Sequence, residues 1–107
     1  MRKIEALMNR AIVACKNWKL DNTEVVYNQE QDVNEIYLYN KLIARVGDTW
    51  IQLFDTGYQS NTVKSRLNAL LLMNGGDDCG RVYQKDFQWF YSDSQQTVPF
   101  TNGMVLN

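Results

Sequence analysis

The side chains that could carry chemistry are mainly carboxylates, because the chain has 12 aspartates and glutamates but no histidine. The absence of histidine excludes Ser–His–Asp catalysis, Cys–His catalysis and histidine-based zinc sites. Cys15 and Cys79 are the only cysteines and no Cys-x-x-Cys motif is present, so they cannot form a structural zinc site alone. No glycine-rich phosphate-binding loop occurs. The sequence therefore assigns no catalytic residue, no metal ligand and no cofactor, and we do not expect an enzyme.

Asp77 and Asp78 have the most suggestive setting among the carboxylates, since they lie in the glycine-flanked segment 75–80. Such a loop could hold a hard cation, but its spacing does not match the alternating ligands of an EF-hand loop. A solvated acidic turn is therefore the favoured interpretation. Acid–base catalysis by a pair of carboxylates stays open as a further alternative, because nothing in the sequence singles out two of the acids.

The basic side chains suggest nucleic-acid binding as an alternative function. Lys64 and Arg66 fall in the first turns of a predicted helix, but at about 100° per residue they flank its apolar stripe on opposite sides. Charged residues at stripe edges usually lay their stems on the core and direct the charge outward. The net charge of −1 gives no overall attraction to phosphates. The residues of this alternative surface are Arg2, Lys3, Arg10, Lys64 and Arg66.

The length of 107 residues predicts a single domain spanning residues 1–107. The longest apolar run, 69–73, is too short to cross a bilayer, so no membrane association is expected. Two isolated cysteines are typical of reduced thiols, which favours a cytoplasmic location. Segment 1–20 has five basic residues and one acidic residue, whereas segment 21–40 has five acidic residues and no basic one. We expect these two segments to lie near each other.

Apolar residues at helical spacing predict an amphipathic helix over about residues 2–17. Cys15 falls in the middle of the apolar stripe, so burial as a small hydrophobic residue is favoured over a reactive thiol. Trp18 would extend the stripe by a further turn. The stripe consists of Ile4, Leu7, Met8, Ala11, Ile12 and Cys15.

Residues 23–54 have the pattern of a four-strand antiparallel meander. Gly47-Asp48 predicts a two-residue hairpin turn that would place Arg45 opposite Trp50, and Asn40-Lys41 predicts another tight turn. This register predicts a core face of Tyr37, Tyr39, Leu42, Ala44, Val46, Ile51 and Leu53. The opposite face would carry Ile36, Leu38, Ile43, Arg45, Trp50, Gln52 and Phe54.

A second helix is predicted to begin after an N-cap at Ser60 or Asn61 and to end at Gly75-Gly76. Its stripe consists of Val63, Leu67, Leu70 and Leu71, while Leu72 points to the opposite side with Ser65 and Asn68. Beyond it, we expect short strands at 81–83 and 87–91 around a turn at Lys85-Asp86, an edge segment at 98–100 and a turn at Asn102-Gly103.

The sheet face with Trp50 and Phe54 is too apolar to be fully solvated and too polar to form a second core. Leu72 adds a further exposed apolar side chain. A surface of this kind predicts a covering element or a partner. We therefore expect a protein interface that includes Trp50, Phe54 and Leu72.

Three segments resemble small uncharacterised proteins encoded by tailed phages, including marine ones. The segments are Gln52–Gly57, Thr62–Leu71 and Gln84–Phe90, and the resemblance covers roughly the C-terminal two thirds of the chain. These phage proteins have no established activity, so the resemblance implies no site residues. It implies a viral gene expressed in a bacterial cytoplasm, where small accessory proteins commonly bind host proteins or nucleic acid.

The sequence predicts an α+β domain of element order α-β-β-β-β-α-β-β, with an antiparallel sheet packed against two helices. The leading hypothesis for its function is a non-enzymatic protein-binding module that binds itself or a host protein. The alternatives are nucleic-acid binding and a small carboxylate-dependent enzyme. The sequence does not identify a partner, a substrate or an oligomeric state.

Overall fold

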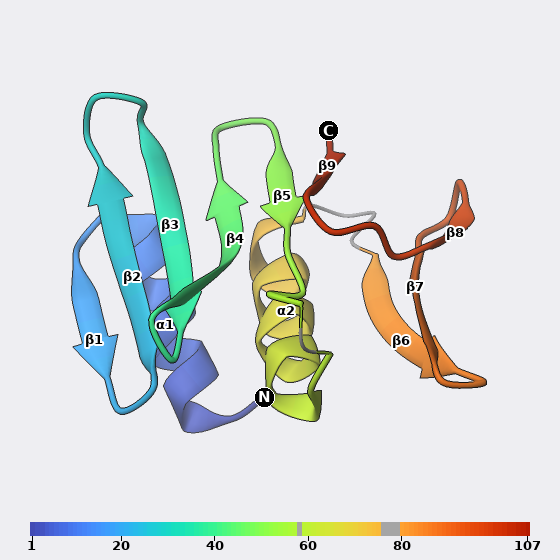
Figure 1. Ribbon diagram of the computed structural model, residues 1–107. Helices are drawn as coiled ribbons and strands as arrows, with labels where there is room; N and C mark the ends of the chain where they lie inside the picture. Colours follow the sequence, from blue (N-terminus) through green and yellow to red (C-terminus); the bar gives the residue numbers. More distant parts are fainter. Residues whose placement is uncertain (58, 76–79) are drawn as a thin grey trace.

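The structure is a computed structural model that describes residues 1–57, 59–75 and 80–107. These residues form two α-helices and two antiparallel sheets (Figure 1). Sheet A has the strand order β1-β2-β3-β4-β5-β9, and sheet B has the order β6-β7-β8. The elements are α1 (Lys3–Ala14), β1 (Trp18–Leu20), β2 (Thr23–Asn28), β3 (Val33–Leu38), β4 (Lys41–Val46), β5 (Ile51–Leu53), α2 (Asn61–Asn74), β6 (Arg81–Lys85), β7 (Gln88–Ser92), β8 (Thr97–Pro99) and β9 (Met104–Leu106).

The predicted α+β class and the meander of β2 to β5 are confirmed. β8 corresponds to the predicted edge segment, whereas β1 and β9 are strands that were not predicted. β9 follows the predicted turn at Asn102-Gly103 and returns to sheet A, where Leu53 pairs with Met104. On the other edge of sheet A, Lys19 of β1 lies opposite Glu24 of β2. The basic and acidic segments of the sequence therefore lie side by side, as predicted.

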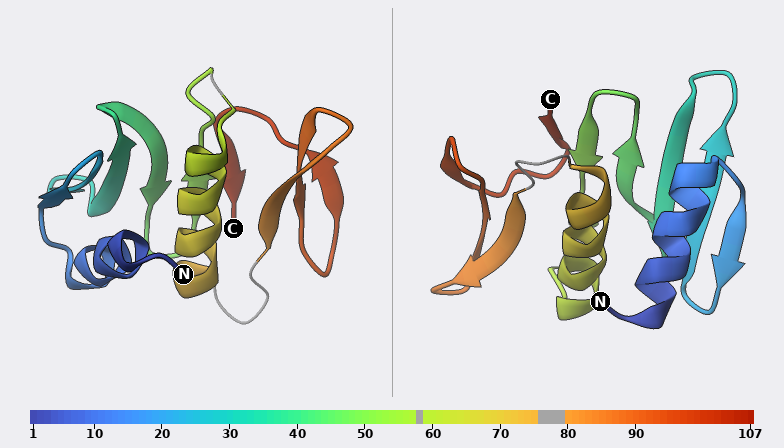
Figure 2. Two further views of the ribbon diagram at one scale, coloured as in Figure 1. Left: turned by 90° about the horizontal axis from the view of Figure 1, so that it is seen from below. Right: turned by 180° about the vertical axis from the view of Figure 1, so that it is seen from behind.

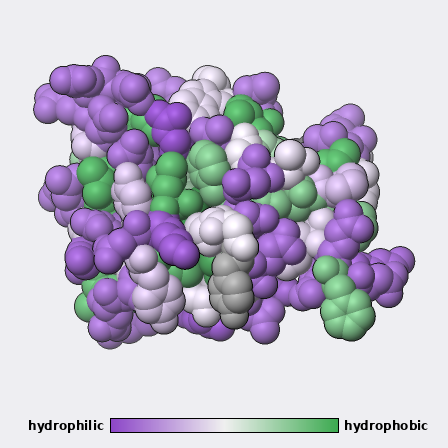
Figure 3. Space-filling model, viewed as in Figure 1, coloured by the Kyte–Doolittle hydropathy of each residue, from purple (hydrophilic) through white to green (hydrophobic). Residues whose placement is uncertain are grey.

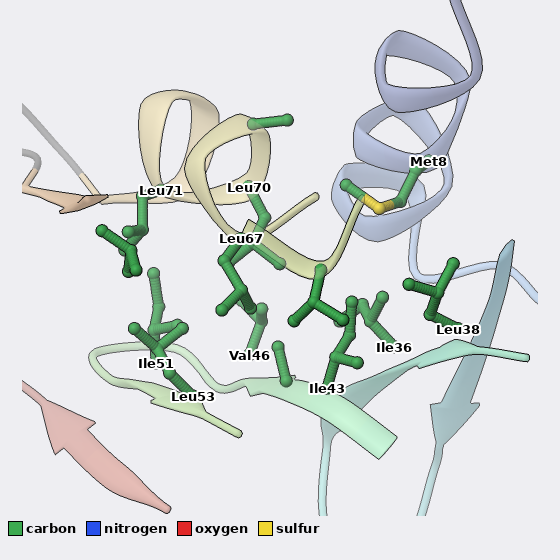
Figure 4. Close-up of a cluster of buried hydrophobic side chains, with 14 of the residues drawn as sticks. Met8, Ile36, Leu38, Ile43, Val46, Ile51, Leu53, Leu67, Leu70 and Leu71 are labelled. Carbon is green, nitrogen blue, oxygen red and sulfur yellow. The ribbon is translucent and has the colours of Figure 1, made fainter. Parts of the chain in front are cut away.

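α1 and α2 lie on the same face of sheet A (Figure 2). The main core forms between these helices and the sheet, where Met8, Leu67 and Leu70 meet Ile36 and Ile43 (Figure 4). All five side chains are fully buried, so their transfer out of water supplies much of the driving force for folding. No helix in the described part of the chain is long and apolar enough to cross a membrane.

The opposite face of sheet A has no covering element among the described residues (Figure 2). The register places Val26, Glu35, Arg45, Gln52 and Val105 in one row across it. Polar and apolar side chains are mixed on this face (Figure 3). Three of the apolar residues predicted for this face, Ile36, Leu38 and Ile43, lie in the core instead. Arg45 and Gln52 lie on the outer face as predicted.

The turn between β3 and β4 is formed by Tyr39 and Asn40, with φ of 51° and 64°, one residue earlier than predicted. Because side chains alternate along a strand, this slip exchanges the two faces of β3. Ile36 and Leu38 lie in the core, whereas Tyr37 and Tyr39 lie outside, so their predicted faces were wrong.

An irregularity in the pairing of β3 with β4 also changes which side chains of β4 are buried. Ile36 pairs with Ala44 but Tyr37 pairs with Leu42, which leaves Ile43 between the two pairs. Ile43 and Ala44 are both fully buried, and Leu42 is only half-buried beside Tyr37. A β-bulge redirects side chains in this way, so the predicted outward position of Ile43 was wrong.

The loop between β4 and β5 has four residues, 47–50, and is closed by the Gly47 N–H, which donates to the Trp50 carbonyl at 2.9 Å. Val46 therefore pairs with Ile51, and Arg45 pairs with Gln52. The predicted two-residue turn and the predicted pairing of Arg45 with Trp50 were wrong. A shift of two residues preserves the faces, so the predicted burial of Val46 and Ile51 is confirmed.

α1 ends at Ala14 because Cys15 adopts a left-handed conformation, with φ of 53°. Cys15 is exposed, so its predicted burial was wrong. The Asn17 side chain accepts a hydrogen bond from the Tyr27 N–H at 2.8 Å, which ties the segment after the helix to β2. Trp18 consequently begins β1 and packs against the core from a strand rather than from a further helical turn.

α2 begins as predicted, since the Ser60 side chain accepts a hydrogen bond from the Val63 N–H at 3.1 Å. Its predicted stripe of Val63, Leu67, Leu70 and Leu71 is buried. The helix ends at Asn74 with Gly75 as its C-cap, and the predicted contribution of Gly76 lies outside the described residues.

Candidate interaction surface

Two of the residues predicted to form a protein interface, Trp50 and Phe54, lie beside the Arg45–Gln52 pair on the outer face of sheet A, whereas Leu72 lies on α2. Trp50 is half-buried and lies so close to Gly47 that a Cβ on this glycine would be 2.3 Å from the Trp50 Nε1. Phe54 is half-buried close to Gly103, at the turn before β9. Leu72 is 59% exposed on α2, facing sheet B. The structure therefore separates Leu72 from Trp50 and Phe54, so the three residues do not form one surface.

Trp50 has an internal partner. The Arg45 guanidinium carbon lies 5.6 Å from the centroid of the Trp50 ring, a cation–π contact that forms although the two residues are not paired across the strands. Arg45 also donates to the Gln31 side chain at 2.6 Å. These contacts hold Arg45 and Trp50 against their own chain.

Leu72 lies next to the outer face of sheet B. It lines a groove together with Asn68, Arg81 and Ser92. Asn68 fixes this arrangement, because its Nδ2 donates to the Val82 carbonyl at 2.8 Å and its Oδ1 accepts from the Val82 N–H at 2.7 Å. The side chain thus replaces a neighbouring strand at the edge of β6 and anchors sheet B to α2.

Sheet B has one buried face and one open face. Val82, Trp89 and Tyr91 are buried against the core. On the other face, Tyr83 pairs with Phe90, and the two rings stack with centroids 5.7 Å apart. The Arg81 guanidinium carbon lies 5.2 Å from the centroid of the Tyr83 ring. We define the hairpin surface as Leu72, Arg81, Tyr83, Phe87 and Phe90.

Phe87 lies at the tip of the β6–β7 hairpin and is 96% exposed. Asp86 and Phe87 form the turn, with φ of 53° and 65°, so the predicted turn at Lys85-Asp86 was wrong by one residue. A bulky side chain at positive φ is a genuine outlier. The alternation of Trp89 and Tyr91 as buried residues could have indicated the correct register, but the sequence offers no Asn-Gly or Asp-Gly pair to mark this turn.

The basic residues predicted for nucleic-acid binding also fail to form one surface. Arg66 is buried, and its Nη1 lies 2.8 Å from Glu5 Oε2 in an ion pair between α2 and α1. Lys64 is half-buried on α2. The remaining members, Arg2, Lys3 and Arg10, are exposed at the start of the chain and along α1.

Two carboxylates, Asp32 and Asp48, lie at the end of the molecule where α1 and α2 terminate. Tyr27 donates a hydrogen bond to Asp32, and this bond, with burial and the nearby Asp48 charge, raises the pKa of Tyr27 to about 12. Asp32 and Asp48 both line a small cavity there. Asp77 and Asp78, the predicted candidates for a cation, lie outside the described residues. Within the described residues, no group of three or more Asp, Glu or Cys side chains is arranged for metal binding.

Comparison with known proteins places the whole chain in a phage family. No curated protein sequence and no solved structure matches the chain. Residues 1–107 match the family described as Kyanoviridae Gp96 protein. This match extends the resemblance to tailed-phage proteins from three segments to the full length. The chain therefore belongs to the Kyanoviridae Gp96 protein family.

Proposed function

We propose that this phage protein is a non-enzymatic protein-binding module and that the hairpin surface contacts its partner. The observation that carries the proposal is the 96% exposure of Phe87 in a left-handed turn conformation. Exposure of the ring and the strained backbone both oppose folding, and Phe87 gives no compensating contact within the core. Packing of Phe87 against a partner protein would compensate for both costs.

The composition of the hairpin surface supports a protein partner. Aromatic residues and arginine are enriched at the energetic centres of protein interfaces. Tyr83 and Phe90 are held by their mutual stacking, so little conformational entropy remains to be lost when a partner packs on them. Arg81 already lies over Tyr83, which leaves Lys85 as the more available cation on this face. Nucleic-acid binding would need a larger number of cations.

Replacement of Phe87 by asparagine separates binding from folding. Phe87→Asn should stabilise the fold by about 1 kcal/mol, because asparagine tolerates the left-handed conformation better than phenylalanine. Tyr39→Asn is the matched control, since Tyr39 is a 69% exposed aromatic residue at positive φ in the turn of another hairpin. Urea unfolding should show similar stabilisation of both variants.

Binding should distinguish the two variants. Affinity purification from infected host cells, quantified by mass spectrometry, should recover a partner with the unmodified protein and with Tyr39→Asn. Recovery should fall at least about tenfold with Phe87→Asn, as expected for a central interface residue. Sedimentation velocity tells whether the partner is a second copy. Equal recovery with both variants would contradict the proposal, as would salt-dependent binding to single-stranded DNA or RNA that requires Arg81 and Lys85.

A further inference from the structure

The solvent side of α1 carries a basic surface at the opposite end of the molecule from the β6–β7 hairpin (Figure 1). Exposed residues recur along this helix at intervals of three and four, so they form one stripe. Arg2 precedes the helix as its N-cap and Lys16 follows its end, and both are exposed. We define the α1 basic face as Arg2, Lys3, Ala6, Arg10, Val13 and Lys16.

The cations of the α1 basic face are not neutralised by acidic residues of their own helix. Glu5 is the acidic residue of α1, and it is buried in the ion pair with Arg66. Among the described residues this is the only ion pair, so the four cations of the face have no internal counterion. Glu24 and Glu35 lie on the outer face of sheet A, whereas α1 covers the inner face. The helix therefore presents a face of uncompensated positive charge.

The spacing of the cations suits the phosphate backbone of a nucleic-acid duplex. Lys3 and Arg10 are seven residues apart, which is about 10 Å along the helix axis. Phosphates on one strand of duplex DNA advance about 3.4 Å per base pair, so this distance corresponds to roughly three base pairs. Ala6 lies between the two cations and its small side chain permits close approach. The α1 basic face contains no aromatic residue on which unpaired bases could stack.

We infer that the α1 basic face binds the phosphate backbone of duplex nucleic acid without reading its base sequence. Lysine and arginine contacts to phosphates position a protein on a duplex but carry no sequence information. The net charge of −1 adds no attraction from the rest of the molecule, so the binding depends on this face and is strongest at low salt. Four phosphate contacts predict a slope of about −3 to −4 for log K against log salt concentration.

Fluorescence anisotropy of a short labelled DNA duplex, titrated with the full-length protein, tests the inference. The affinity should fall about 100-fold between 50 mM and 200 mM salt. An RNA duplex of the same length shows which nucleic acid supplies the preferred backbone. Lys3→Gln/Arg10→Gln should weaken binding at the lower salt concentration at least about tenfold and make the salt slope shallower by about two, because it removes two phosphate contacts.

Lys41→Gln/Lys85→Gln is the matched control. It lowers the net charge from −1 to −3, as the α1 variant does, but removes exposed lysines at the start of β4 and the end of β6. Binding and salt slope should stay unchanged, and circular dichroism should show both variants folded.

Equal loss of binding in the two double variants would overturn the inference, as would the absence of salt-dependent binding to either duplex. Tighter binding to vesicles of anionic phospholipid than to the duplexes would assign the α1 basic face to a membrane surface instead. Phe87→Asn should leave duplex binding unchanged. The result is therefore independent of the hairpin surface and of its protein partner.

Discussion

Glu5→Gln is expected to destabilise the protein by about 3–5 kcal/mol, the loss typical of breaking a buried ion pair from one side. Glu5 and Arg66 are each only 3% exposed, and their charged atoms lie 2.8 Å apart. The Arg66 Nε also donates to the Thr23 Oγ1 at 3.1 Å. The substitution would leave the guanidinium charge buried among α1, α2 and β2 without its counterion.

Urea unfolding followed by circular dichroism measures this loss, with Glu30→Gln as the control. Glu30 is exposed, so its substitution should change the free energy of unfolding by no more than about 0.5 kcal/mol. The double variant Glu5→Leu/Arg66→Met should be less destabilised than Glu5→Gln, because it removes both charges. A loss below about 1 kcal/mol for Glu5→Gln would show that the pair is not a central element of the fold.

The Glu5 carboxylate should also make the stability of the fold depend on pH. Burial acts to raise the pKa of Glu5, but hydrogen bonds from Ser65, Arg66 and the Arg2 N–H outweigh it and lower the pKa below its ordinary value of 4.5. The folded state therefore binds the proton less readily than the unfolded chain. The stabilisation is complete above the ordinary pKa and is lost as pH falls through the lowered pKa of the folded state. Glu5→Gln should flatten this acid dependence.

Trp89→Ala is expected to cost about 3–5 kcal/mol, as truncation of a buried tryptophan typically does. Trp89 is 2% exposed and is the largest fully buried side chain of the described residues. Its ring meets Phe100 edge to face, with centroids 5.5 Å apart, and so joins β7 to the segment between β8 and β9. Removal of the indole would leave a cavity where sheet B attaches to the core.

Hydrogen exchange should localise the effect of Trp89→Ala. Amides of sheet B should lose more protection than those of β2 to β4, because sheet B would open separately from the main core. Phe90→Ala is the control from the other face of the same strand. Phe90→Ala should lower the free energy of unfolding by only about 1–2 kcal/mol, since Phe90 is half-buried and its main contact is the stacked ring of Tyr83. Uniform loss of protection would contradict a separate opening of sheet B.

Turn positions account for most differences between the predicted and the observed sheet. At both Tyr39 and Phe87, an aromatic residue occupies a left-handed turn position that local propensity assigns to asparagine or glycine. Each turn therefore lies one residue away from its predicted place. For β3 the slip exchanged the buried and outer faces, because alternation transmits a one-residue error along the strand.

The burial of Arg66 was also beyond the reach of sequence patterns. Its place at the edge of the apolar stripe of α2 predicts a stem on the core and a charge directed outward, and the outward charge was wrong because the guanidinium is buried against Glu5. The ion pair with Glu5 joins residues that are 61 positions apart, however, and no local spacing encodes such a contact. For the same reason the pairing of Asn68 with the edge of β6 is visible only in three dimensions.

The sequence alone determined the α+β class, both amphipathic helices, an N-cap at Ser60 or Asn61 and the confirmed part of the core face, because these features depend on local periodicity and side-chain chemistry. The tertiary structure decided the β3 face, the return of β9 to sheet A, the ion pair of Glu5 with Arg66, and the surfaces that remain open. These features depend on which distant segments pack together. Packing could place Phe87 in an unfavourable backbone conformation and bury Arg66 because the free energy of the whole core exceeds any single local preference.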